Sequence, residues 1–229
     1  DQGVLEFRSV NFGANEGGSS LSNISFRAGP GRKVAIVGGQ GGGKSAIFNL
    51  VLRLHDPTHG SITIDGHDIR NVTPESLHAS LGIVPRDSVV FSGTIMENIR
   101  YANPLFTEEQ VYQACEYLGL HHKFLSLPNA YATRVGGKGL ELTRGDLQLV
   151  AIARVMVKDP KIILVDEATD EMDTTTETLI HMSLKRLCAG RTVISIAYAD
   201  TSKYSLQLGL GTNIFIDAAS RRSPRQTRY

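Results

Sequence analysis

The chain has 229 residues, of which 41% are hydrophobic and 21% are charged, and its formal net charge is +1 at pH 7. This length and composition are typical of a folded soluble protein that buries a sizeable core. The near-neutral charge gives no reason to expect a nucleic-acid partner. No apolar run approaches the roughly 18 residues that a bilayer-spanning helix needs, and no signal peptide opens the sequence.

The cysteines and the two ends of the chain give further expectations. Cys115 and Cys188 have no metal-type spacing, so we expect core or half-buried thiols in a reducing compartment. The first residue is Asp1 rather than Met, which favours a domain excised from a longer protein. Arginines crowd the end of the chain, and we expect residues 219–229 to form a basic tail.

The first third of the chain has the pattern of an antiparallel hairpin followed by α/β elements. A helix is expected from Lys44, and Thr73-Pro74-Glu75 opens another with threonine as N-cap and proline at the first helical position. A turn at Asp65-Gly66 closes a short strand. The expected strands are Val4–Phe12, Leu21–Arg27, Val34–Val37 and Ser61–Asp65.

Helical patterns dominate the middle of the chain, and alternation of strands and helices returns after it. The middle helices are expected at Thr94–Ile99, Thr107–Leu118 and Asp146–Val157, the second with a capping box. Later elements are the strands Ile162–Asp166, Thr192–Ala197 and Asn213–Asp217 and the helix Thr176–Cys188. The sequence therefore predicts one α/β domain, with a core at 1–85 and 158–218 interrupted by a helical insertion at 86–157.

The segment Gly38–Ser45 fits the phosphate-loop pattern G-x-x-x-x-G-K-[ST] in its required context, between a predicted strand and a predicted helix. Its glycines let the backbone curl and direct N–H groups at phosphate oxygens, and the helix adds its positive N-terminal end. Lys44 is expected to reach the terminal phosphates. The predicted nucleotide-binding residues here are Gly38, Gly39, Gln40, Gly41, Gly42, Gly43, Lys44, Ser45 and Ala46.

A second segment, Ile162–Asp170, reads as a buried strand that ends in two acids, Asp166 and Glu167. An acid at this place holds the waters of a metal ion, and the next one polarises an attacking water. We therefore expect Ser45 and Asp166 to serve Mg²⁺ and Glu167 to act as general base. Together the two segments predict a site for a nucleoside triphosphate with Mg²⁺.

The order of these landmarks resembles the nucleotide-binding domain of an ATP-binding cassette (ABC) transporter over nearly the whole chain. Ser92–Ile99 (SGTIMENI) and Thr133–Gly139 (TRVGGKG) are similar to segments of the exporter branch, the multidrug-type and half-transporters. The stretch Gly139–Arg154 stands where that family has its signature motif, and Asp159-Pro160-Lys161 leads to the acidic strand as in the family.

This resemblance implies a fold, partners and a location. The fold would be a P-loop NTPase (RecA-like) α/β core with an antiparallel β subdomain and an inserted helical subdomain. Two such domains, as a homodimer or a heterodimer, would pair head to tail and hold ATP between the phosphate loop of one and the signature motif of the other, with Thr143 and Gly145 among the nucleotide-binding residues. Each would serve a transmembrane domain at the cytosolic or organelle-matrix face of a membrane.

The chain departs from the family pattern at three motifs. Arg86 stands where a glutamine senses Mg²⁺ and water, and Tyr198 replaces the switch histidine. The signature reads Leu142–Asp146 (LTRGD), in which Arg144 adds bulk and Asp146 adds negative charge near phosphate. We therefore expect MgATP binding with slow or partner-dependent hydrolysis.

Two other functions stay open at this point. In one, the domain is a fully active transport ATPase that uses Glu167 with Tyr198 and Arg86 as working substitutes. In the other, it is a non-catalytic regulatory module in which ATP only controls dimerisation.

Overall fold

The computed structural model describes residues 2–13, 21–37, 43–166, 173–197 and 213–217. Internal contacts divide the chain into two compact units. The first contains the described residues within Asp1–Gly82, Lys161–Glu167 and Gly190–Tyr229, and the second those within Ile83–Pro160 and Ala168–Ala189.

The first unit contains an antiparallel sheet in the order β2-β1-β4-β5. The expected hairpin is confirmed, because β1 and β2 pair antiparallel from Leu5↔Ala28 to Phe12↔Leu21. Their alternation buries Leu5 and Phe7 on one face, and the ring of Phe7 stacks on that of Phe26 at 4.6 Å. The strands are β1 (Leu5–Phe12), β2 (Leu21–Ala28), β4 (His59–Ile64) and β5 (His67–Asp68).

A second sheet of the structure has the strand order β11-β3-β10-β9-β6. The pairs β10–β3, β10–β9 and β11–β3 are parallel, as expected for strands that alternate with helices. Strand β6 is not predicted from the sequence pattern, because it follows α2 without a turn signal. The strands are β3 (Lys33–Val37), β6 (Leu81–Val84), β9 (Ile162–Asp166), β10 (Thr192–Ala197) and β11 (Asn213–Asp217).

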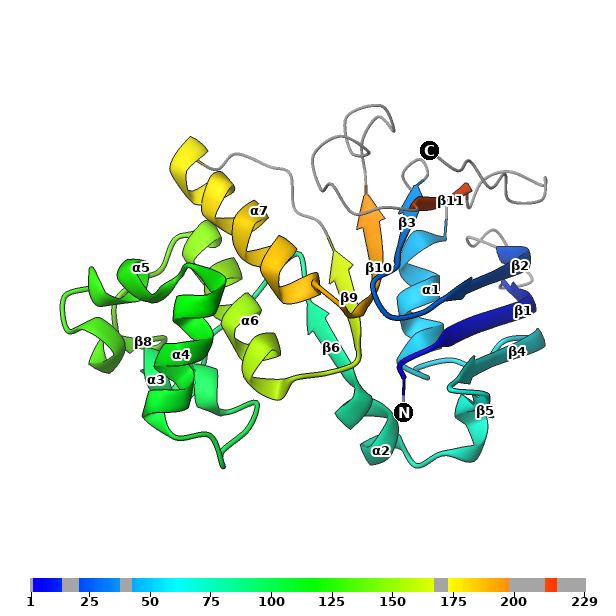
Figure 1. Cartoon of the computed structure of the whole chain (residues 1–229), viewed down its shortest axis with the longest axis horizontal. Helices are drawn as coiled ribbons and strands as arrows, with labels where there is room; N and C mark the ends of the chain where they lie inside the picture. The colour runs from blue at the N-terminus through cyan, green and yellow to red at the C-terminus, as the bar shows by residue number, and fades with distance from the viewer. Residues whose placement is uncertain (1, 14–20, 38–42, 167–172, 198–212, 218–229) are drawn as a thin grey trace. The chain divides into compact units, whose positions relative to one another are not determined.

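Helix α1 (Lys44–Val51) lies between the two sheets and contributes to one continuous core (Figure 1). Its residues Ile47 and Leu50 are fully buried with strand residues such as Leu5 and Ile36. This burial, rather than helix propensity, holds an element of only two turns in place. Helix α1 is therefore positioned from both sides before any ligand binds.

Two short helices complete the described part of the first unit. The 3-10 helix η1 (Ile69–Asn71) follows β5, and α2 (Pro74–Ser80) follows η1. The predicted cap is confirmed, since the hydroxyl of Thr73 accepts a hydrogen bond from the N–H of Ser76 at 3.3 Å.

The second unit is mainly helical. The capping box expected at Thr107 with Gln110 is confirmed, and a second capping box forms at Thr94 with Glu97. Cys115 and Cys188 are both buried, as expected. Its elements are β7 (Gly93–Thr94), α3 (Ile95–Arg100), α4 (Glu108–Leu118), α5 (His121–Leu125), η2 (Ala130–Ala132), β8 (Arg134–Val135), α6 (Arg144–Lys158) and α7 (Thr174–Cys188).

Helix α7 belongs to the second unit, although the sequence analysis assigned 158–218 to the core. The reason is that α7 packs against α4 and α6. The hydroxyl of Tyr117 donates to the Arg186 carbonyl at 3.1 Å, and the Arg186 guanidinium donates to the Tyr117 carbonyl at 3.0 Å. The boundaries of the functional subdomains stay a prediction. None of the helices in the described ranges is long and apolar enough to cross a membrane.

Two glycines of β4 and its turn give a test of the antiparallel sheet. Gly60 (φ 83°) lies at the irregularity between β1 and β4, where an added Cβ would collide with the carbonyl oxygens of Arg8 and Ser9. Gly66 (φ 82°) occupies the hairpin turn with Asp65 (φ 50°), and a Cβ there meets nothing within 4 Å.

We expect Gly60→Ala to lower the free energy of unfolding by about 3 kcal/mol, because it adds a backbone clash to the left-handed strain. Gly66→Ala carries only the strain and should cost about 1 kcal/mol. Urea unfolding of both variants measures the difference, and equal losses would contradict the described register of β1 and β4.

Candidate functional site

Helix α1 begins directly after Gly43, the last glycine of the predicted phosphate-binding segment. Gly43 adopts a left-handed conformation (φ 77°, ψ 8°) and is the N-cap of α1, so no side chain caps the helix at that residue. The N–H groups at such an end carry partial positive charge and suit an anion. Gly38, Gly39, Gln40, Gly41 and Gly42 lie outside the described residues.

Lys44 is the first residue of α1, and its side chain is almost fully buried, with 3% of the residue exposed. Burial lowers the pKa of the Lys44 ammonium below its ordinary value, and the negative charge of Asp166 partly opposes this shift. A buried ammonium that is coupled to a carboxylate is costly for a structural residue. This ammonium lies at the N-terminal end of α1, where an anion is favoured.

Asp166 is the last residue of β9, and the parallel register relates it to the end of β3. Asp166 pairs with Ile196 of β10, which in turn pairs with Ile36 of β3, one residue before the end of that strand. The carboxyl ends of β3 and β9 therefore meet at one edge of the sheet, with β10 between them. In open α/β sheets ligands bind at this edge.

The side chains at this edge fit a magnesium nucleotide. The exposed Ser45 supplies a hydroxyl and the half-buried Asp166 supplies a carboxylate, both oxygen ligands of the type that Mg²⁺ prefers. Ala46 completes the first turn of α1 through its N–H bond to the Gly43 carbonyl at 3.0 Å. The residues at this site therefore have the chemistry that ATP with Mg²⁺ requires.

Two more predicted site residues, besides those of Gly38–Gly42, lie outside the described part of the chain. Glu167, the expected general base, follows directly after Asp166, and Tyr198, at the switch position, follows directly after β10. Their roles stay predictions.

The signature residues lie at the start of α6 in the second unit. The hydroxyl of Thr143, the N-cap, accepts from the N–H of Asp146 at 3.1 Å, and Gly145 is buried. Nζ of Lys123 lies 3.0 Å from Oδ1 of Asp146. This lysine, which the sequence analysis missed, offsets the charge that Asp146 brings to the motif.

Arg144 replaces a signature glycine and pairs within its own unit. Its Nη2 lies 3.0 Å from Oδ1 of Asp87, the residue after Arg86. Both side chains are substantially exposed, so this ion pair contributes little stability. Arg86 itself is half-buried. Arg144 is thus paired with the residue that follows Arg86 in the sequence, and both arginines are departures from the family pattern.

A buried polar cluster, also missed from sequence, holds the segment that follows Arg86. Asn98 is fully buried, and its amide bonds both the N–H and the carbonyl of Phe91 and the carbonyl of Thr94, each at 3.0 Å. Arg154 of α6 donates to Oδ1 of Asn98 at 2.6 Å and to the carbonyl of Val89 at 2.6 Å. The signal available in sequence was the position of Asn98 on the same helix face as Ile95 and Ile99.

Comparison with known proteins identifies the family that shares these features. A model of the family described as "ABC transporter" matches residues 21–170, well over half of the chain. The Heavy metal tolerance protein of Schizosaccharomyces pombe is 49% identical over 197 residues, which cover 86% of this chain and 24% of that protein. ATP-binding cassette sub-family B member 6 of Homo sapiens is 43% identical, again over 86% of this chain and 23% of that protein.

A solved structure agrees with the sequence relatives. A bacterial Atm1-family ABC exporter with ATP bound has a TM-score of 0.81 and 40% identity, and the match covers 96% of this chain and 38% of that chain. The predicted exporter-type nucleotide-binding domain and its P-loop NTPase fold are thereby confirmed. The chain spans about a quarter of the length of the curated relatives that it matches.

Proposed function

Because the chain belongs to the ABC transporter family, we propose that it binds MgATP through Gly38–Ser45 and Asp166 and hydrolyses it slowly or only with a partner. The observation that carries this proposal is the buried Lys44 ammonium coupled to Asp166, at the edge of the sheet where the phosphate loop begins. Bound Mg²⁺ would neutralise phosphate charge, with Ser45 and Asp166 as its protein ligands.

The altered residues around the proposed general base support impaired hydrolysis. Glu167 is retained, but a guanidinium at Arg86 cannot accept hydrogen bonds from water as a glutamine carbonyl does. A phenol at Tyr198 has an ordinary pKa of about 10, so it donates one hydrogen bond but does not exchange protons near neutral pH as imidazole does.

We further propose that the domain pairs head to tail with a second such domain, in a homodimer or a heterodimer. The start of α6, with Thr143 and Gly145, would face the nucleotide held by the partner. Arg144 adds volume there, which favours weak closure. The Lys123–Asp146 pair reduces the repulsion that Asp146 would otherwise bring toward phosphate.

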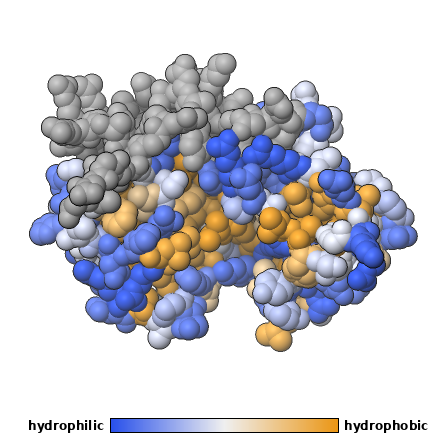
Figure 2. Space-filling view, turned by 180° about the vertical axis from the view of Figure 1, so that it is seen from behind, coloured by the Kyte–Doolittle hydropathy of each residue, from blue (hydrophilic) through white to orange (hydrophobic). Residues whose placement is uncertain are grey.

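A transmembrane domain is the other proposed partner, and it would place this chain at the cytosolic or matrix face of a membrane. The relatives are about four times longer than the matched region. Figure 2 shows hydrophobic surface, in orange, interrupting the hydrophilic exterior. Among the described residues of the second unit, exposed apolar side chains include Val89, Phe91, Tyr101, Leu105 and Leu140. These side chains would be available to contact another domain.

Phosphate release tests the proposed impairment. We expect the unaltered chain to bind MgATP with little turnover, and the double variant Tyr198→His with Arg86→Gln to raise turnover more than the sum of the single variants. The reason is that both residues act on one arrangement of water and phosphate. Steady-state phosphate release is the measurement, with Glu167→Gln as the control that removes the proposed base.

Two other results would select the alternative functions. Rapid phosphate release by the unaltered chain that Glu167→Gln abolishes would indicate a fully active ATPase. Stable nucleotide-dependent dimers, with no turnover even in the double variant, would indicate a regulatory module. Additive effects of the two substitutions would contradict a shared defect.

A further inference from the structure

The end of α1 opposite the phosphate loop is closed by a residue in an unusual backbone conformation. Arg53 has φ 54°, in the left-handed region that glycine usually occupies after a helix. Its N–H donates to the Leu50 carbonyl at 3.1 Å, and the N–H of Leu54 donates to the Asn49 carbonyl at 2.8 Å. These two bonds define a Schellman motif, in which glycine would cause less strain than arginine.

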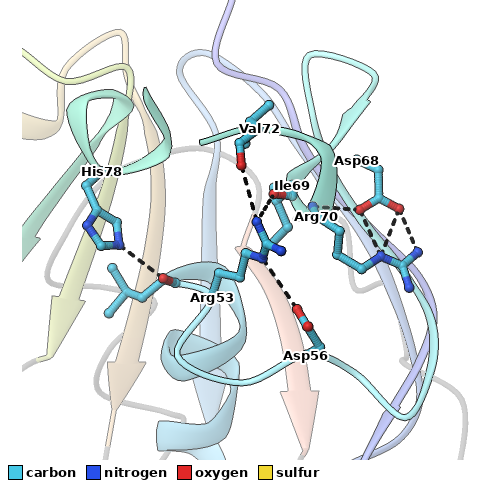
Figure 3. A network of polar contacts seen from close by, with 8 residues as sticks. Arg53, Asp56, Asp68, Ile69, Arg70, Val72 and His78 are labelled. Atoms are coloured by element: carbon cyan, nitrogen blue, oxygen red, sulfur yellow. Dashed lines mark hydrogen bonds and ion pairs between the residues drawn. The ribbon is translucent and has the colours of Figure 1, made fainter. Parts of the chain in front are cut away.

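The side chain of Arg53 makes contacts that glycine could not make. Its Nη1 donates to the carbonyl oxygens of Ile69 at 3.4 Å and Val72 at 3.2 Å, and its Nε lies 3.6 Å from Oδ1 of Asp56 (Figure 3). Ile69 begins η1, and Val72 is its C-cap. The guanidinium therefore attaches the end of α1 to the segment after β5.

A second side chain attaches the same helix end to α2. Nε2 of His78 lies 3.1 Å from the carbonyl oxygen of Leu52, the C-cap of α1 (Figure 3). The carbonyls at a helix C-terminus lack partners within the helix, so a donor here both satisfies one of them and holds the helix. The end of α1 is thus held by groups from η1 and α2.

This attachment bears on the opposite end of the helix because α1 is short. It has eight residues, a length of about 12 Å, and a helix of this length depends on tertiary contacts for its orientation. Lys44 stands at its first position. A shift of the Arg53 end therefore changes the direction of the N–H groups and the ammonium at the Lys44 end.

We propose that Arg53 is a positioning residue for nucleotide binding. By fixing the C-terminal end of α1 to η1, it sets the direction from which Lys44 and the first turn of α1 meet the phosphate groups. The contact with η1 also explains why arginine occupies a backbone conformation that suits glycine. The inference rests on the proposed function, in which Gly38–Ser45 binds MgATP.

The test compares nucleotide affinity with stability in Arg53→Gly. Glycine keeps the Schellman motif and relieves its strain but removes the contacts to Ile69 and Val72. We expect the melting temperature of the nucleotide-free chain to stay close to that of the unaltered chain, while the Kd for a fluorescent ATP analogue with Mg²⁺ rises on the order of 10-fold. A residue with only a structural role would move the melting temperature and leave the affinity unchanged.

Arg70→Met is the matched control. Arg70 lies on η1 itself, and its guanidinium pairs with Asp68 at 2.7 Å (Figure 3). Its removal should leave the Kd unchanged. If Arg53→Gly fails to fold, Arg53→Lys replaces it, because lysine retains the charge but not the planar fork that reaches two carbonyls.

The outcomes separate the two proposals. If the unaltered chain does not bind the analogue, the proposed function fails, and this inference fails with it. If the unaltered chain binds and the Arg53 variant binds equally well, the inference alone is overturned. An equal loss of affinity in Arg70→Met would also overturn it, since the effect would then not depend on the end of α1.

Discussion

Replacement of Lys44 by methionine is expected to raise the Kd for MgATP by about 100-fold or more. The side chains have similar lengths, so the change removes one ammonium and little volume. A hydrogen bond between charged groups contributes about 1.5–3 kcal/mol, and more where the pair is shielded from water, as at the buried Lys44. Isothermal titration calorimetry with a non-hydrolysable analogue and excess Mg²⁺ measures the loss.

The same substitution should behave differently in the nucleotide-free chain. Burial lowers the pKa of Lys44, so its charged form is held at a cost when no anion is present, although Asp166 offsets part of that cost. We therefore expect the free energy of unfolding of Lys44→Met to change by less than about 1 kcal/mol in either direction.

Lys158 offers a matched control. It lies at the end of α6, and burial lowers its pKa too. Lys158→Met should leave ATP affinity unchanged. Unaltered affinity in Lys44→Met, or an equal loss in Lys158→Met, would contradict the assignment of Lys44 to the phosphates.

Replacement of Asn98 by alanine is expected to lower the free energy of unfolding by about 3–5 kcal/mol. The fully buried amide bonds the N–H and carbonyl of Phe91, the carbonyl of Thr94 and the guanidinium of Arg154. Its removal leaves several polar groups without that partner, and each buried group left unsatisfied costs about 1–3 kcal/mol. Urea unfolding followed by circular dichroism measures the loss.

Gln113 provides the control for Asn98. Its exposed amide donates to Glu109 at 3.3 Å within α4, and such a surface contact contributes little. Gln113→Ala should change the free energy of unfolding by less than about 0.5 kcal/mol. A loss below 1 kcal/mol in Asn98→Ala would mean that water replaces the amide and that the cluster does not hold the segment.

Local chemistry made much of the fold predictable from sequence. Thr73 and Thr107 cap their helices as the sequence predicts, and Asp65-Gly66 forms the hairpin turn with both φ angles positive. These signals depend on a few adjacent residues. By contrast, β6 has little periodicity of its own and is placed beside β9, which lies far away in the sequence.

The sequence predicts candidate site residues where a motif carries its own chemistry, as at Lys44 and Asp166, and their roles stay predictions. Partners distant in sequence were not. Nothing near Asp146 indicates Lys123, and nothing near Arg144 points to Asp87, because these pairs form only when α5, α6 and the segment after β6 pack together. The strained Arg53 could not be predicted either, since its sequence position does not report its backbone angle.

The buried thiol of Cys115 offers a chemical probe of motion in the second unit. Burial raises the pKa of this thiol to about 11, even though a hydrogen bond with Tyr131 lowers it somewhat. At neutral pH only about one molecule in 10⁴ then carries the reactive thiolate, and the sulfur lies beneath its neighbours. Alkylation of native Cys115 would therefore proceed through transient opening of the surrounding helices. The rate of alkylation would then report how often these helices open.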